Sequence, residues 1–355
     1  MKVLYGVQGT GNGHIARARI MARALAERND IEVDFVFSGR ERGAYFDMEC
    51  FGDFETYDGL TFVTHRGKVD KWKTVCQAKP TTLINDIRKF DLSKYDLVLN
   101  DFEPITAWAA KNQGVTSISV SHQAAFSYDV PKSGASPLDK VIMKLFAPTD
   151  LKLGVHWFHF NQPILPPFVS DKPCETPSNK HVLVYLPFES LDDINALLEP
   201  LSDQQFICYH PDVKSVVKNG HILWNPPSKT TFSQHLQHCS GVIANGGFEL
   251  SSEALQLGKK LLIKPLQGQF EQLSNVITLN QLELCHTLFS LDTDIVEEWL
   301  NVAPMEPITF PDDPHPMLDW LIKRQWHNTK PLCDYLWQQV QFPDKTRQRL
   351  LSLAI

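Results

Sequence analysis

A histidine and an aspartate each follow a short apolar run of the kind that forms a buried strand. His14 closes the glycine-rich loop GTGNGH after the run at residues 3–7, and Asp101 follows the run at residues 96–100. The carboxyl ends of parallel strands meet at one edge of a sheet, and ligands bind there. A histidine at that edge can take the proton of an attacking hydroxyl, and a neighbouring carboxylate can orient its ring. The sequence therefore predicts a general base, His14, held by Asp101.

Both residues also have a simpler explanation. His14 could cap the helix that follows its loop, and Asp101 could cap a helix that begins near Pro104. Glu103 is a second acidic candidate for the role of Asp101. If the side chains of His14 and Asp101 point away from a cleft, a protein that binds its ligand without catalysis becomes the better interpretation.

A second group of residues lies at positions 241–275. An apolar run at 242–244 is broken by Asn245, Gly246 and Gly247, and a predicted helix then begins at Phe248 and ends at Gly258. The first N–H groups of a helix have no partner within it, and a glycine pair lets a diphosphate approach them.

Three acidic or amide side chains accompany this turn. Glu253 lies about a turn and a half into the predicted helix, where it could reach a ribose diol. Glu271 and Gln272 follow the next predicted strand and could bind sugar hydroxyls. The simpler alternative is an ordinary strand–helix–strand crossover with a solvated Glu253, because glycine pairs after strands are common.

This stretch resembles the donor-binding signature of GT-B glycosyltransferases, including the lipid II N-acetylglucosaminyl transferase and the UDP-glycosyltransferases of small molecules. The residues that carry the resemblance are Gly246-Gly247, Glu253, Gly258-Lys259, Pro265, Glu271-Gln272 and Asn275-Val276. The small-molecule enzymes usually have histidine where this chain has Asn245, so their details transfer poorly. The whole chain also resembles a bacterial and archaeal group of glycosyltransferase-like proteins.

The resemblance implies two doubly wound, Rossmann-like α/β domains that face each other across a cleft. Alternating predicted strands and helices favour the same class. We expect an acceptor-side domain at residues 1–165, a nucleotide-sugar domain at 166–315, and helices at 316–355 that pack back on the first domain. The stiff segment at 161–167 is a predicted linker.

The implied reaction moves a hexosyl or N-acetylhexosaminyl group from a nucleotide diphosphate sugar, with UDP expected, to an acceptor hydroxyl. In these families the histidine after the first glycine loop is often the base, which here is His14. Asn245, Gly246, Gly247, Phe248, Glu253, Glu271 and Gln272 would bind the donor. Gly11, Gly13, His122 and Gln123 would bind the acceptor, and His122-Gln123 resembles part of a His-Glu-Gln-Asn stretch of the lipid II enzyme. No cofactor or metal is expected, because no Asp-x-Asp follows a predicted strand and a helix N-terminus can replace the metal.

Composition limits the partners. The net charge of −7 gives a nucleic acid no overall attraction, and no apolar run approaches the roughly 18 residues of a membrane span. Seven scattered cysteines without a Cys-x-x-Cys pair favour reduced thiols in the cytoplasm, and a first strand at residues 2–6 leaves no place for a signal peptide.

A peripheral membrane contact is a further hypothesis. The segment at 132–160 mixes lysines with apolar residues that include Trp157 and Phe158, and could rest on the inner face of the membrane to admit a lipid-linked acceptor. A core helix and strand are the alternative. The oligomeric state is open.

A dinucleotide oxidoreductase is the rival enzyme class. The segment GNGHIA at 11–16 fits the permissive Gly-x-Gly-x-x-Ala pattern, and Arg40 would suit the 2′-phosphate of NADP. This alternative leaves the residues from Gly246 to Gln272 unexplained.

Overall fold

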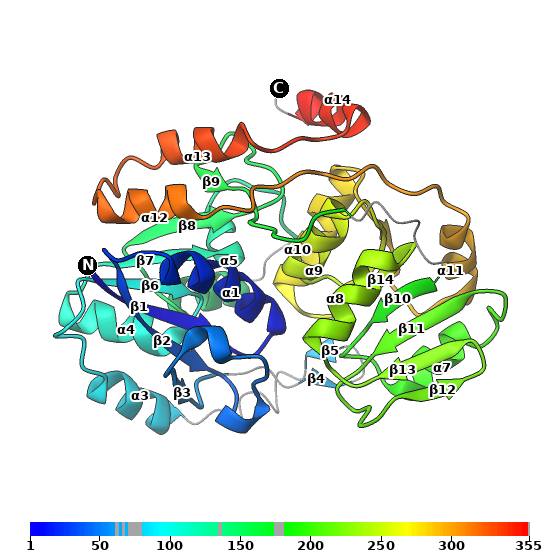
Figure 1. Ribbon diagram of the computed structural model, residues 1–355, viewed down its shortest axis with the longest axis horizontal. Helices are drawn as coiled ribbons and strands as arrows, with labels where there is room; N and C mark the ends of the chain where they lie inside the picture. Colours follow the sequence, from blue (N-terminus) through cyan, green and yellow to red (C-terminus); the bar gives the residue numbers. More distant parts are fainter. Residues whose placement is uncertain (61–63, 66–67, 70–79, 134–136, 174–180, 354–355) are drawn as a thin grey trace.

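The computed structural model describes residues 1–60, 64–65, 68–69, 80–133, 137–173 and 181–353. The chain forms two halves, each built on a seven-stranded sheet with helices against it (Figure 1). This arrangement confirms the predicted class of two doubly wound α/β units.

The N-terminal sheet has the strand order β3-β2-β1-β6-β7-β8-β9, and every neighbouring pair is parallel. Its strands are β1 (Lys2–Gln8), β2 (Glu32–Ser38), β3 (Glu55–Tyr57), β6 (Leu97–Asp101), β7 (Ser117–Ser121), β8 (Leu151–Val155) and β9 (Ile164–Leu165). Its helices are α1 (Asn12–Ala26), α3 (Pro80–Lys89), α4 (Pro104–Gln113), α5 (His122–Ala125) and α6 (Pro137–Leu145), and two short strands, β4 (Thr64–His65) and β5 (Lys68–Val69), form a separate ribbon. The central strands β1, β6 and β7 are almost continuous buried runs, as parallel strands covered on both faces must be.

The C-terminal sheet has the order β12-β13-β11-β10-β14-β15-β16, in which only the pair β12 and β13 is antiparallel among the described pairs. Its strands are β10 (His181–Tyr185), β11 (Gln205–Tyr209), β12 (Val217–Asn219), β13 (Ile222–Asn225), β14 (Gly241–Asn245), β15 (Lys260–Lys264) and β16 (His286–Thr287). Its helices are α7 (Leu191–Leu198), α8 (Lys229–His238), α9 (Phe248–Gln256), α10 (Phe270–Gln281) and α11 (Thr293–Leu300). The order reverses beside β10, as it does beside β1, and ligands bind at such switch points.

The chain then returns to the N-terminal half. Helices α12 (His315–Ile322) and α13 (Lys330–Trp337) lie beside β8 and β9 (Figure 1), and Trp337 Nε1 donates to the carbonyl of Ile164 at 2.6 Å. The last helix, α14 (Asp344–Leu353), differs from the expectation for residues 316–355. Its Arg349 donates to the carbonyl of Gln281 at 3.0 Å, so α14 contacts the C-terminal half.

Two segments that cross between the halves are fastened together. Val169 N donates to the carbonyl of Pro311 at 2.9 Å. The buried side chain of Gln256, at the end of α9, donates to the carbonyl of Val169 and accepts from the N–H of Phe310, each at 2.9 Å. One amide group therefore holds both crossings.

The segment predicted as a linker, 161–167, is not a free connection, because Ile164 and Leu165 form the last strand of the N-terminal sheet. The proposed membrane surface at 132–160 also changes. Trp157 and Phe158 are buried in the core, so neither contributes to a surface. None of the helices in the described parts of the chain is long and apolar enough to cross a membrane.

Candidate active site

A cleft of about 610 Å³ lies between the two halves, at the carboxyl ends of both sheets. It brings together residues that are far apart in the sequence and that the sequence predicted as site residues. Those that line it are Gly11, Gly13, His14, His122, Gln123, Asn245, Gly247, Phe248, Glu271 and Gln272. Asp101 is buried behind His14. Gly246 is buried next to Gly247, where its N–H donates to Gln272. Glu253 lines a second cavity.

His14 and Asp101 form a hydrogen-bonded pair. β1 and β6 are neighbours with Val7 opposite Asp101, so the first turn of α1 passes over the end of β6. His14 Nδ1 lies 2.8 Å from Asp101 Oδ1, and the Asp101 side chain is fully buried. Since a carboxylate only accepts, Nδ1 carries the proton and Nε2 is left as the basic atom. His14 lines the cleft, which is the orientation that a general base requires.

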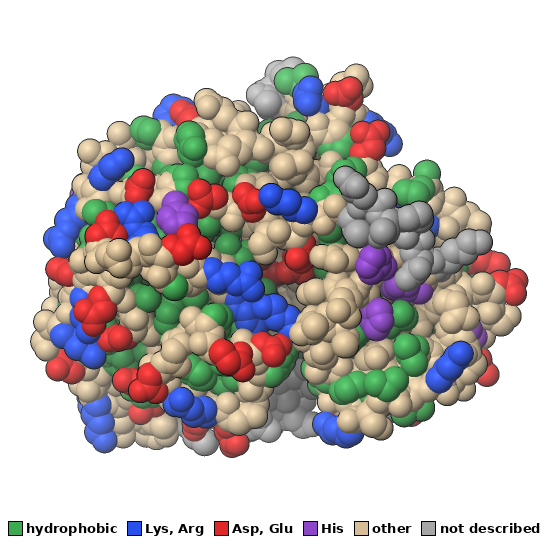
Figure 2. All heavy atoms as spheres, viewed as in Figure 1, with side chains coloured by type: hydrophobic (Ala, Val, Ile, Leu, Met, Phe, Trp, Pro, Cys, Tyr) green, Lys and Arg blue, Asp and Glu red, His purple; other side chains and the backbone are tan. Residues whose placement is uncertain are grey.

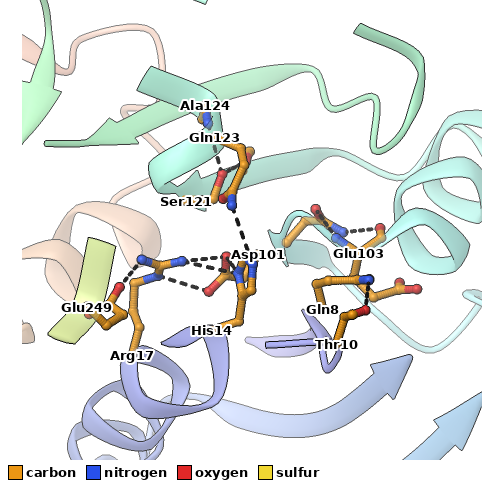
Figure 3. A network of polar contacts seen from close by, with 12 residues as sticks. Gln8, Thr10, His14, Arg17, Asp101, Glu103, Ser121, Gln123, Ala124 and Glu249 are labelled. Atoms are coloured by element: carbon orange, nitrogen blue, oxygen red, sulfur yellow. Dashed lines mark hydrogen bonds and ion pairs between the residues drawn. The ribbon is translucent and has the colours of Figure 1, made fainter. Parts of the chain in front are cut away.

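Arg17, which the sequence analysis missed, completes this pair. Its Nε and Nη2 atoms donate to the two oxygens of Asp101 at 2.9 and 2.8 Å, and its Nη1 donates to Glu249 on α9 (Figure 3). The signal was present in the sequence, because residues three apart lie on one face of a helix and His14 precedes Arg17 by three. Glu249 could not be paired with Arg17 from sequence, since the contact joins the two halves.

Burial and charge compete in this cluster. Burial alone would raise the pKa of Asp101, but the Arg17 cation and His14 outweigh it and hold that pKa below its usual value. Burial opposes the charge on Arg17, yet the carboxylates of Asp101 and Glu249 raise its pKa. Burial raises the pKa of Glu249 to about 7, although Arg17 acts in the opposite direction.

The alternative roles of the acidic residues are resolved by helix α4. Its N-cap is Glu103, whose carboxylate accepts from the N–H groups of Ile105 and Thr106 at 2.8 and 2.6 Å. Glu103 is fully buried in this contact and lies away from His14 as a cap. Asp101 therefore does not cap the helix, and Glu103 is not a candidate for orienting the base.

The turn at 245–247 offers backbone N–H groups to the cleft. Gly247 is the N-cap of α9, and no side chain among the described residues caps this helix. A Cβ added to Gly247 would meet nothing within 4 Å, whereas one on Gly246 would lie 2.9 Å from the carbonyl of Gln272. The first glycine is thus required by packing, and the second leaves the helix N-terminus open to a ligand.

Two amide side chains hold this turn in place. Gln272 accepts from the N–H groups of Gly246 and Leu266 through Oε1, at 3.1 and 2.9 Å. Asn245 donates to the carbonyl of Lys264, but its Oδ1 is buried without a hydrogen-bond partner among the described residues. An unpaired buried acceptor on the cleft wall is a position where a ligand hydroxyl would be stabilised.

Glu253 lines a smaller cavity of about 220 Å³, which shares Asn12, Gly13 and Tyr185 with the main cleft. Arg19, Arg23 and Lys229 also line it, and Figure 2 shows Lys and Arg side chains gathered over α1 beside the junction of the halves. Burial, followed by the carboxylates of Asp171 and Glu249, raises the pKa of Glu253 to about 8.

Residues at the strand ends of the C-terminal sheet separate into two groups. Tyr209 and Pro227 line the smaller cavity. His210 and Trp224 are buried, and His210 Nε2 is bonded to the carbonyl of Glu189 at 3.0 Å. Only the first group faces a space that could hold a nucleobase.

Gln123 and His122, two of the predicted acceptor-binding residues, differ in how their side chains are hydrogen-bonded. Gln123 donates to Glu271 at 3.0 Å and lies 3.4 Å from His14 Nε2, so it links His14 to Glu271 of the C-terminal half. His122 is buried, with Nδ1 at 2.9 Å from the Val155 carbonyl and Nε2 at 2.6 Å from Asn275 Oδ1. Acceptor binding by His122 stays a prediction, and it would require one of these contacts to break.

Phe102 forms part of the cleft wall beside Asp101. Its φ is 55°, a left-handed conformation that is uncommon for an aromatic residue. Its ring stacks on that of Phe146 with centroids 4.7 Å apart, and both rings line the cleft. The backbone strain therefore coincides with an aromatic surface next to the base.

The residues that a metal site or NADP would use have the following positions. Within the described residues, no three His, Cys, Asp or Glu side chains gather as a metal site would require. Arg40 lines the cleft and donates to Asn12 Oδ1 and to the carbonyl of Thr10, both at 2.9 Å.

Cys50, Cys208, Cys239, Cys285 and Cys333 are free thiols, and Cys76 and Cys174 lie outside the described residues.

The raised pKa of Glu253 predicts a pH-dependent stability. In the unfolded chain Glu253 ionises near pH 4.5, whereas in the folded protein it stays protonated until about pH 8. Its contribution to stability therefore declines as the pH rises between these values. As the pH rises from 4.5 to 8.5, the free energy of unfolding of Glu253→Gln should increase relative to wild type by on the order of 1–3 kcal/mol. Partial exposure of the site keeps this increase below the value that the full pKa shift would give. Urea unfolding at both pH values measures it, with the exposed Glu298→Gln on α11 as matched control. An equal gain at both pH values would contradict the prediction.

Comparisons with known proteins agree with the site geometry in indicating a glycosyltransferase. A profile of glycosyl transferase family 1 matches residues 1–304. No protein of curated function matches the chain by sequence. The glycotransferase of kitacinnamycin superposes with a TM-score of 0.57 at 14% identity, covering 96% of this chain and 99% of the other. MurG of Acinetobacter baumannii gives 0.51 at 14%, covering 84% and 89%.

UGT2 of Phytolacca americana, complexed with UDP-2fluoro-glucose and pterostilbene, gives a TM-score of 0.57 at 12% identity and covers 99% of this chain and 98% of its own. At such identities the superpositions establish the GT-B fold, and the activity follows from the family. The assignment displaces the oxidoreductase alternative. With the profile extending over both sheets and the cleft between them, the chain belongs to glycosyl transferase family 1.

Proposed function

We propose that this protein transfers a sugar from a UDP-sugar to an acceptor hydroxyl without a metal ion. The observation that carries the proposal is the position of His14, held through Nδ1 by Asp101 and lining the same cleft as the open N-terminus of α9. A base and a diphosphate site on opposite walls are the two parts that glycosyl transfer requires.

The donor would lie along the C-terminal wall of the cleft. Its diphosphate would accept from the first N–H groups of α9 beyond Gly247, and its ribose would reach Glu253 in the smaller cavity. Glu271, Gln272 and the unpaired Oδ1 of Asn245 would receive the sugar hydroxyls. Solved structures with a TM-score of 0.57 hold UDP or UDP-2fluoro-glucose, which supports uracil as the base.

In the reaction His14 Nε2 would take the proton of the acceptor hydroxyl as its oxygen bonds to the anomeric carbon. The bond from that carbon to the diphosphate breaks, and the leaving diphosphate keeps the electron pair. The positive end of the α9 dipole meets the new charge, a role that metals have in other transferases. Asp101 keeps the ring oriented and stabilises the imidazolium that forms.

A lipid-linked acceptor at the inner face of the cytoplasmic membrane is the finer part of this proposal. Val141 and Leu145 on α6 are about half exposed, with fractions of 51% and 48%, and Phe146 carries the same surface to the cleft wall. We expect the protein to sediment with phosphatidylglycerol vesicles at low salt and Val141→Glu/Leu145→Glu to sediment less. Failure of the wild-type protein to sediment would remove the membrane from the proposal.

Gly247→Val tests the diphosphate site. Gly247 has φ −74° and open space at its Cβ, so a valine fits the fold but projects into the cleft. UDP affinity, measured by calorimetry, should fall at least 100-fold while the thermal midpoint changes little. Gly246→Ala is the contrasting variant, because its Cβ would press on Gln272 and should lower the midpoint. Unchanged UDP affinity in folded Gly247→Val would place the diphosphate elsewhere.

His14→Ala and Asp101→Asn test the base. A positioned base contributes about 10²–10⁴-fold, so His14→Ala should lose that much in kcat while UDP affinity stays near the wild-type value. Asp101→Asn should cost less, because the imidazole remains, and the double variant should be no slower than His14→Ala alone. Turnover of UDP-sugars, with water or an added alcohol as acceptor, provides the measurement. Losses that multiply in the double variant would show that the two residues act independently.

A further inference from the structure

The buried cluster behind the cleft holds more charge than a base and its orienting acid require. Arg17 is 4% exposed and lies between two carboxylates, Asp101 of the N-terminal half and Glu249 of the C-terminal half. Buried ion pairs are costly to desolvate, so their presence at a catalytic pair calls for a role. The cluster is also the place where α1 and α9, two of the helices whose N-termini line the cleft, are joined by charge.

The charges around His14 act on its ring in opposite directions. Asp101 on β6 favours the imidazolium, whereas Arg17 Nη2, 3.3 Å from His14 Nδ1, opposes it. Glu249 on α9 favours it from the other half, and Glu271 on α10 does so from the far side of Gln123. On β1 the buried hydroxyl of Tyr5 faces Asp101 and Arg17, and its pKa is raised by burial, so it stays neutral.

The sign of this balance matters for catalysis. A carboxylate beside an imidazole favours its protonated form, and a protonated ring cannot accept a proton. The bidentate contact from Arg17 neutralises Asp101, and Glu249 in turn offsets part of the charge of Arg17. Arg17 therefore couples the His14–Asp101 pair to Glu249 of the C-terminal half, in addition to the link through Gln123 to Glu271.

We propose that Arg17 and Glu249 are positioning residues that set the protonation state of His14 across the domain boundary. The inference rests on the proposed function of His14 as the base. It adds that Glu249, the second residue of the diphosphate-binding helix, belongs electrostatically to the catalytic pair on the opposite wall.

The test measures the titration of His14 directly. The full-length protein, labelled with ¹³C-histidine and free of nucleotide, is titrated by NMR between pH 4.5 and 9, and the His14 signal is assigned by its absence in His14→Gln. Arg17→Gln should raise the midpoint by about one pH unit, because an opposing positive charge is removed. Glu249→Gln should lower it by less, about half a pH unit, because burial holds the pKa of Glu249 at about 7 and the residue carries only part of its negative charge over this pH range.

Controls separate charge from packing. Arg17→Lys keeps the charge and should titrate near wild type, and it serves if Arg17→Gln does not fold. Glu27→Gln makes the same charge change as Glu249→Gln at the exposed end of α1, about 20 Å along the helix, and should leave the midpoint unchanged.

Opposite shifts in Arg17→Gln and Glu249→Gln support the inference, and so does a lowered midpoint in Glu249→Gln alone beside an unchanged Arg17→Lys. A midpoint that stays within 0.2 pH units of wild type in Glu249→Gln overturns it. Because no donor is present, that result would leave the proposed sugar transfer intact. Conversely, full turnover by His14→Ala would remove the base and leave the measured titration shifts in place.

Discussion

A cation buried between two carboxylates constrains much of this active site. The cost of burying the Arg17 cation is offset by Asp101 and Glu249, which both contact it. Asp101 in turn fixes the ring of His14, and Glu249 fixes the first turn of α9. Moving any of these groups would leave a buried charge without its partner, which is far more costly than the pair itself is stabilising. Charged side chains therefore fix the positions of the groups around the cleft, which the surrounding apolar strands could not do by themselves.

The same network explains why two glycine-rich loops from different halves are used together. Gly13 allows α1 to approach Glu249, since a Cβ there would lie 3.1 Å from its Cγ. Gly246 allows its loop to pack against Gln272, and Gly247 keeps the helix N-terminus open. Gly13 and Gly246 are therefore required for close packing, whereas Gly247 is required for access to the helix N-terminus, although all three lie in glycine-rich turns.

Much of the architecture was predictable because buried parallel strands are continuous apolar runs and their ends converge. His14 and Asp101 were expected to meet for that reason, and α9 was expected from residue 248. The contact of Arg17 with Glu249 was not, because no pattern along the chain fixes how two halves face each other. Ile164 and Leu165 were read as part of a linker because two residues are too few for a strand pattern, and their pairing with β8 decided the matter. Trp157 and Phe158 pack in the core, although the lysines near them in the sequence suggested a surface.

The amide of Gln256 has a mechanical consequence. It holds two of the segments that cross between the halves, at the end of α9 opposite to the one that lines the cleft. These bonds join Val169 and Phe310 to a single side chain, so a rotation between the halves that bends these two segments would pivot near them. With the pivot at its last residue, α9 acts as a lever about 14 Å long, so a few degrees of hinge rotation move its first turn by an ångström or less. Occupation of the cleft and the angle of the hinge are thus linked through one rigid helix.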